Sequence, residues 1–168
     1  QLVYVAIRLA DPGGLGEADR MDVRSAAPPS LLNAMRESAK QDMIASEYVN
    51  DFTLTFDDVV PAIVNARSRD LTLPNAIVLA QLKLLAEHGD SLIARKCGEE
   101  VSRQCAARAS RVLDAGDPRD ESYHAALSDF DFWLRSDGHR RNPGATADLI
   151  AAGLFVCLRD GIIAPPFG

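Results

Sequence analysis

The sequence predicts an all-α protein, a helical bundle that forms a single domain over residues 1–168. Apolar residues recur every three or four positions along most of the chain, and clusters of glycine and proline separate the helical segments. Strand-like alternation occurs in one short stretch only, DFTLTF at 51–56. A chain of 168 residues, 47% of them hydrophobic, is long enough to bury a core without disulfides or a structural metal.

Four helical segments are predicted in the N-terminal half of the chain. Ser30 is a suitable N-cap for the second segment, and Pro61 suits the first turn of the third. Gly89 is a suitable C-terminal cap for the fourth, because glycine adopts the left-handed conformation that ends many helices. The four segments span residues 2–10, 31–49, 56–69 and 73–89.

The longest predicted helix begins at Asp90 or Ser91 and continues to about Ala115, where Gly116 ends it. Its apolar residues keep helical spacing, so we expect them to be buried and the helix to be central. They are Ile93, Cys97, Val101, Cys105, Ala109 and Val112. Two further helices follow, over residues 121–137 and 142–161.

Charge and composition argue against several classes of function. The formal net charge of −6 argues against a general nucleic-acid or membrane-surface binder, so neither is an expected partner. No apolar run is long enough to span a bilayer and no signal peptide is visible. The three cysteines make no disulfide framework, which favours a reducing cytoplasm. Cys97 and Cys105 lie about 12 Å apart along one predicted helix, too far for a disulfide, and the histidines show no zinc spacing with the cysteines.

The segment RRNPGATAD, which opens the last helix, is the strongest candidate for phosphate binding. Asn142 is a suitable N-cap and Pro143 suits the first helical position. Gly144 would let a ligand approach the backbone, where the free N–H groups of a helix start attract phosphate. Arg140 and Arg141 would add charge-assisted hydrogen bonds. A well-capped helix preceded by two solvated arginines explains the same pattern, and both interpretations stay open.

Two carboxylates are candidates for catalysis. Asp42 continues the apolar spacing of Leu32, Met35 and Ala39, so we expect it on an inward face, as a functional group or as the partner of a lysine or arginine. Asp148 lies in the second turn of the last helix. It suits a magnesium ligand or an acceptor for a ribose hydroxyl, or only a carboxylate placed favourably near the positive end of a helix.

A second basic segment, DSLIARKCG, places Arg95 and Lys96 one turn after a helix start. Such residues hold phosphates at the flank of a helix, although solvated surface charges are more common. The glycines of DPGGLG lack the strand–glycine–helix context of a dinucleotide site and the lysine of a P-loop. Turn formation alone explains them.

Five segments of the chain occur in the order in which one known family has them. They are AIRLADPGGLG, the DV at Asp22 and Val23, LLNAMRESAKQDMIASEYVNDF, DSLIARKCGEEV and NPGATADLIAAGLF. On these segments the chain resembles the triphosphoribosyl-dephospho-CoA synthase family, and the last segment is the most specific. The others are more similar to the archaeal-type branch than to the citrate-lyase branch. The resemblance spans nearly the whole chain but only the C-terminal part of the family domain, which fits the abrupt start at Gln1.

The resemblance implies an all-helical transferase. Members of known activity take ATP and dephospho-CoA, join the ATP ribose to a ribose hydroxyl of dephospho-CoA and release adenine. This reaction needs a carboxylate to accept a proton and to stabilise charge at the sugar carbon, a task that suits Asp42 and Asp148, and magnesium at the triphosphate, with Asp148 as its ligand. The candidate phosphate-binding and nucleotide-binding residues are Arg95, Lys96, Arg141, Asn142, Gly144 and Thr146.

Two other functions stay open. Members of the branch that this chain resembles also occur beside one-carbon cofactor pathways, so an enzyme of methanopterin-type or methylofuran-type cofactor biosynthesis, acting on a related nucleotide substrate, is the second hypothesis. A non-catalytic helical half that binds nucleotide is the third. An N-terminal segment on a partner chain, or a second copy of this chain, is the candidate protein partner.

Overall fold

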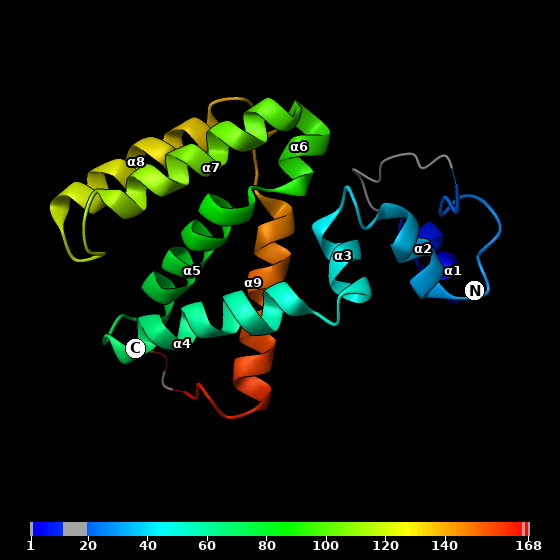
Figure 1. Ribbon diagram of the computed structural model, residues 1–168, viewed down its shortest axis with the longest axis horizontal. Helices are drawn as coiled ribbons and strands as arrows, with labels where there is room; N and C mark the ends of the chain where they lie inside the picture. The colour runs from blue at the N-terminus through cyan, green and yellow to red at the C-terminus, as the bar shows by residue number, and fades with distance from the viewer. Residues whose placement is uncertain (1, 12–19, 166, 168) are drawn as a thin grey trace. The chain divides into compact units, whose positions relative to one another are not determined.

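The structure, a computed structural model, describes residues 2–11, 20–165 and 167. Within these residues it contains nine α-helices, one π-helix and no β-strand, so the predicted all-α fold is confirmed (Figure 1). No helix in the described part is long and apolar enough to cross a membrane. The chain forms two compact units, residues 1–51 and residues 52–168, and the single domain over 1–168 stays a prediction.

The first unit contains three helices, α1 (Leu2–Ala10), α2 (Leu31–Ser38) and α3 (Met43–Val49). Two side chains of α1 hold the segment that precedes α2. The Tyr4 hydroxyl donates a hydrogen bond to the Met21 carbonyl at 2.5 Å, and Arg8 Nε donates to the Val23 carbonyl at 2.6 Å.

The predicted single helix over 31–49 is wrong, because the chain turns between α2 and α3. The Ser38 carbonyl accepts the Asp42 N–H at 3.0 Å, which closes the turn after α2. Asp42 then has extended backbone, and its Oδ1 accepts the N–H groups of Ile44 and Ala45 at 2.9 and 3.0 Å. Asp42 therefore begins a helix as its N-cap and does not continue an apolar stripe along one.

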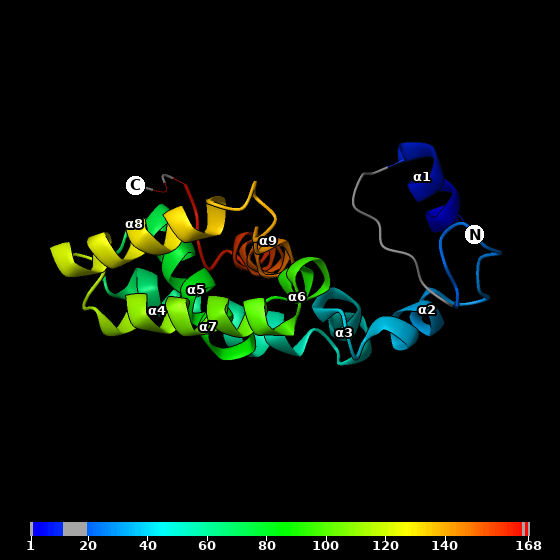
Figure 2. The same cartoon turned by 90° about the horizontal axis from the view of Figure 1, so that it is seen from above.

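The second unit is the larger one, and α5 lies at its centre. Its elements are η1 (Leu54–Val59), α4 (Val60–Ser68), α5 (Leu73–His88), α6 (Ser91–Cys97), α7 (Glu99–Asp114), α8 (Glu121–Arg135) and α9 (Gly144–Arg159). Helix α5 packs against α4, α7 and α9, and α7 pairs with α8 as an antiparallel hairpin (Figure 1). Helix α9 crosses η1 and α4, and Figure 2, which looks nearly along α9, shows α6 beside it.

The DFTLTF segment at 51–56 is not a strand. The residues from Leu54 to Val59 form the π-helix η1, which continues directly into α4. Pro61 lies in the first turn of α4, as its missing N–H requires. Val59 is buried and packs against α9 at Gly153, where an added Cβ would lie only 2.4 Å from Val59 Cγ1. This close approach fixes η1 on α9.

The predicted helix from Asp90 or Ser91 to Ala115 is two helices, α6 and α7, broken at Gly98. Gly98 has φ +95°, a conformation that glycine adopts and other residues rarely do, and its N–H donates to the Ala94 carbonyl to end α6. The expected burial of the apolar stripe is confirmed at four positions, Ile93, Cys105, Ala109 and Val112. Cys97 and Val101, on either side of the break, are half-buried.

One buried residue, Asp90, joins three helices of this unit through its carboxylate and its backbone. Asp90 is 1% exposed, and its Oδ1 accepts the N–H groups of Leu92 and Ile93 at 2.9 and 3.0 Å, which caps α6. Its Oδ2 accepts the N–H and the hydroxyl of Thr146 at 2.8 and 3.0 Å, which caps α9. The Ser102 hydroxyl of α7 bonds the Asp90 backbone N–H and carbonyl, both at 3.1 Å. The ends of α5, α6 and α9 are thereby fixed to one point on α7.

Replacing Asp90 with alanine should lower the free energy of unfolding by about 3–5 kcal/mol, because four donors lose their acceptor inside the protein. Thr146→Val removes only the hydroxyl and should lower it by about 1–2 kcal/mol. Asp129→Ala, at an exposed position of α8, is the control and should stay within about 0.5 kcal/mol of the parent. Urea denaturation followed by circular dichroism measures these values, and an Asp90→Ala variant as stable as the control would contradict this role.

Candidate functional site

The start of α9 was the predicted phosphate site, and the structure places a carboxylate of the protein there. Helix α9 begins at Gly144 with Pro143 as its N-cap residue, so the prediction of Asn142 as N-cap and Pro143 as first helical residue is wrong by one position. The Thr146 N–H is bonded to Asp90, and the Ala147 N–H is bonded to the Pro143 carbonyl at 3.1 Å. The negative group that a helix start favours is therefore already present.

Gly144 and Thr146 are both engaged in packing within the protein. A Cβ added at Gly144 would lie 2.6 Å from Leu92 Cδ2, so glycine at this position lets α9 approach α6. Thr146 is fully buried, and its hydroxyl lies 3.0 Å from both Asp90 Oδ2 and the Pro143 carbonyl. These contacts support a structural role for the two residues, and phosphate binding by either stays a prediction.

The basic residues near this helix start divide into two groups. Arg140 Nη2 donates to the Lys96 carbonyl at 3.0 Å, so the loop before α9 lies against the end of α6. The first group therefore consists of three exposed cations on these adjacent segments, Arg95, Lys96 and Arg140. Arg141 lies against α8 instead. Its Nη1 donates to the Trp133 carbonyl at 2.9 Å, and its guanidinium carbon lies 4.6 Å from the centroid of the Trp133 ring.

A cavity of about 330 Å³ lies between α5, α8 and the loop that precedes α9. Its lining is mostly apolar, with Leu82, Leu85 and Phe130 from the main core and Pro143 from the loop. Polar groups from the same three elements also line it: Gln81, Asp131, Arg135, His139 and Asn142. An apolar cavity of this size with a few polar groups is typical of small-molecule sites. Of the predicted ligand-binding residues, Asn142 lines it.

The two predicted catalytic carboxylates lie in different units of the chain. Asp148 is exposed in the second turn of α9. Asp42 belongs to the first unit, where it is half-buried and caps α3. The expectation that Asp42 lies on the inward face of a long helix is wrong, because that helix is interrupted at this residue.

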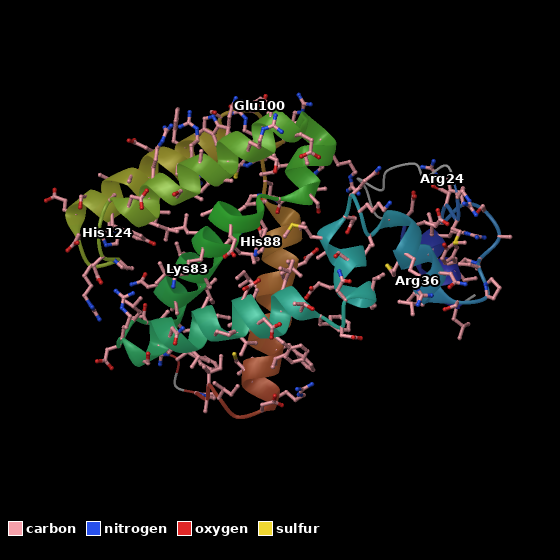
Figure 3. All side chains as sticks on the ribbon, in the orientation of Figure 1. Arg24, Arg36, Lys83, His88, Glu100 and His124 are labelled. Carbon is pink, nitrogen blue, oxygen red and sulfur yellow. The ribbon has the colours of Figure 1, made fainter. Side chains whose placement is uncertain are left out.

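Sequence reasoning did not find the group formed by Asp58, Glu87 and His88. Each of these residues offers one ligand atom, and the three atoms lie within 4.8 Å of one another. His88 Nε2 lies 3.3 Å from Asp58 Oδ2, and Figure 3 shows His88 near the end of α5. The sequence EHGD at 87–90 was the available signal, since it combines ligand types at a helix end. The position of Asp58 depends on the π-helix, which the sequence pattern did not predict.

Cysteine chemistry is disfavoured at two of the three thiols. Burial raises the pKa of the Cys105 thiol to about 12 and also raises the pKa of Cys157. Because a thiolate is the nucleophilic form, both residues stay protonated and inert at neutral pH. The cysteines are free, as predicted.

Comparison with known proteins gives one result at the level of the family. No curated protein and no solved structure matches the chain. The family model described as ATP:dephospho-CoA triphosphoribosyl transferase (CitG) matches residues 1–165, nearly the whole chain. The predicted archaeal-type branch and the correspondence to the C-terminal part of the family domain stay predictions. The chain belongs to the CitG family of ATP:dephospho-CoA triphosphoribosyl transferases and is a transferase.

Proposed function

We propose that this protein transfers the triphosphoribosyl group of ATP to a ribose hydroxyl of dephospho-CoA and releases adenine. The family match over residues 1–165 carries this proposal. In the reaction, the acceptor hydroxyl oxygen forms a bond to C1′ of the ATP ribose while the bond from C1′ to the adenine nitrogen breaks. The hydroxyl proton passes to a base and ends on the departing adenine, so charge and atoms balance.

The cations at the end of α6 and in the loop before α9 suit the triphosphate. Arg95 and Lys96 are exposed, and Arg140 is held beside them by its bond to the Lys96 carbonyl. Three positive charges on adjacent segments favour a group with several negative charges. Arg141 is 22% exposed and already bonded to α8, so in this proposal it fixes the loop and does not contact the phosphates.

The cavity beside this loop suits the adenine base. Its volume of about 330 Å³ exceeds that of a purine, and Asn142 connects it to the segment with the cations. The amide groups of Asn142 and Gln81 can donate to and accept from the edge of a base, while Phe130 and Leu134 offer an apolar surface for its faces. A base bound here would leave its ribose and phosphates at the loop.

We propose Asp148 as the general base. Its carboxylate is exposed to solvent in the second turn of α9, the helix that follows the cationic loop. Magnesium accompanies ATP and uses one or two carboxylates together with phosphate oxygens, so a single exposed aspartate fits it. When bound, the ion would neutralise phosphate charge. Asp42 is proposed as a second catalytic carboxylate, in addition to its role as the N-cap of α3.

Mass spectrometry of the products tests the proposal. Incubation of the full chain with ATP, magnesium and dephospho-CoA should give free adenine and a product heavier than dephospho-CoA by the triphosphoribosyl group. Release of adenine only with a different acceptor, a nucleotide of a one-carbon cofactor pathway, would show that dephospho-CoA is not the substrate. Binding of ATP without any turnover would show a non-catalytic nucleotide-binding protein.

Lys96→Ala should weaken ATP binding by about 1.5–3 kcal/mol, since a charged hydrogen bond to phosphate is lost. Arg141→Ala should leave ATP affinity within about 0.5 kcal/mol of the parent and should lower thermal stability instead, because its guanidinium is bonded to α8. Calorimetry with ATP and magnesium measures the affinities. If Arg141→Ala weakens binding and Lys96→Ala does not, the phosphates lie on the other side of the loop.

Asp42→Asn and Asp42→Ala separate catalysis from capping at this residue. Asparagine caps helices as well as aspartate does, so Asp42→Asn should fold with the stability of the parent, whereas Asp42→Ala should lose about 1 kcal/mol. If the carboxylate is catalytic, both variants lose transferase activity. Full turnover by Asp42→Asn in the product assay would restrict the residue to its capping role.

A further inference from the structure

We propose that this chain binds a divalent transition-metal ion through Asp58, Glu87 and His88, which we call the Asp58–Glu87–His88 triad. These residues are separate from those proposed for catalysis and for phosphate binding. Two carboxylates and one imidazole are contributed by two elements, η1 and the last turn of α5. The proposal does not depend on the transfer reaction, since it rests on the geometry and charge of this triad alone.

The distance between Asp58 and His88 is that of two ligands that share an ion, and Glu87 lies close enough to join them. Metal–oxygen and metal–nitrogen bonds of about 2.0–2.2 Å place two neighbouring ligand atoms roughly 3.0–3.4 Å apart at angles between 90° and 109°. His88 Nε2 and Asp58 Oδ2 are 3.3 Å apart, and the Glu87 ligand atom lies within 4.8 Å of both. An ion beside Asp58 and His88 would therefore need only a small movement of the long Glu87 side chain.

Among the described residues, no lysine or arginine forms an ion pair with either carboxylate of the triad. In the described part of the chain, Asp58 forms an ion pair with His88 and with no lysine or arginine. Glu87 forms no ion pair there, although Lys83 lies one turn earlier on the same face of α5. Figure 3 labels Lys83 and His88 on this helix. Glu87 and His88 lie at the C-terminal, negative end of the 16-residue α5, which favours a cation further.

Buried neighbours hold both parts of the triad in place. Asp58 precedes Val59, which is 1% exposed and packed against Gly153 of α9. His88 precedes Gly89, which has φ +68° and donates its N–H to the Leu85 carbonyl at 2.9 Å. The π-turn of η1 sets the direction of Asp58, because a π-turn changes the angular position of the residues within it, and such turns recur at functional sites. A site preformed on rigid elements needs little reorganisation to bind.

The donor set defines the class of ion. Carboxylates suit manganese and magnesium, and imidazole suits zinc and other late transition metals, so a site with both favours manganese, cobalt or zinc over magnesium. Three protein ligands leave at least one coordination position for water or for a ligand oxygen. His88 and Asp58 are partly exposed, at 27% and 36% of their side chains, so an ion can reach the triad from solvent.

Titration of the full chain, without a histidine tag and after removal of metals with a chelator, tests the proposal. Electron paramagnetic resonance of added Mn²⁺ counts bound ions, and competition with a chromogenic chelator gives the affinity for Zn²⁺. The variants are Asp58→Asn, Glu87→Gln and His88→Gln, which keep side-chain size. The controls are His124→Gln and Glu100→Gln, which replace the same residue types at exposed positions of α8 and α7 (Figure 3).

The parent should bind one Mn²⁺ or Zn²⁺ ion per chain, and each triad variant should bind at least about tenfold more weakly, while both controls bind as the parent does. The metal should also raise the melting temperature of the parent and not of the triad variants, provided that circular dichroism shows all of them folded. A parent that binds neither ion at millimolar concentration, or triad variants with parental affinity, would overturn the proposal. The metal titration contains no nucleotide, so a negative titration does not bear on the transfer reaction. A negative product assay, in turn, does not bear on metal binding by the triad.

Discussion

The arrangement of the second unit depends on the buried carboxylate of Asp90. Both of its oxygens accept two hydrogen bonds, and the donors belong to the starts of two helices that are far apart in the sequence. A helix start leaves N–H groups without partners, and a buried one needs an acceptor from elsewhere in the protein. One side chain meets this need for α6 and α9 together. The backbone of the same residue is bonded to Ser102, so α7 is tied to the same point.

The hydrogen bonds of Asp90 also determine which groups of the neighbouring segments are available to a ligand. Because Asp90 occupies the start of α9, we propose nucleotide binding at the cations Lys96 and Arg140 and at the cavity near Asn142 instead. Just before Asp90 in the chain, the last turn of α5 brings Glu87 and His88 to Asp58, and the chain then turns at Gly89. The two candidate sites are thus positioned by the same few residues of the chain.

Local patterns predicted the helices well and their interruptions poorly. Helix α5 and its glycine cap follow directly from apolar spacing and from Gly89. The breaks at Gly98 and before Asp42 were missed because the apolar spacing continues across both, and only the backbone conformation separates the helices. The π-helix has no sequence signal in single-chain spacing, so DFTLTF suggested a strand.

The candidate site was predictable in its parts and not in its assembly. RRNPGATAD does open a helix beside basic residues, but the bond from Thr146 to Asp90 spans 56 positions and no local pattern contains it. Gly144 was interpreted as room for a ligand, and in the structure an added Cβ at this position would meet Leu92. The ambiguity has one cause: a helix start, a small residue or a carboxylate has the same sequence signature whether its partner is a ligand or another part of the protein.

The environment of Trp133 has an optical consequence. It is the only tryptophan in the chain, and the guanidinium groups of Arg108 and Arg141 lie 4.7 and 4.6 Å from its ring centroid. Its ring also stacks with Phe130, which lines the cavity. Indole emission depends on the charges and polarity next to the ring, so the tryptophan fluorescence of this protein originates at the junction of α8, the cavity and the loop before α9. The chain therefore carries its own spectroscopic reporter beside the proposed nucleotide site, without any added label.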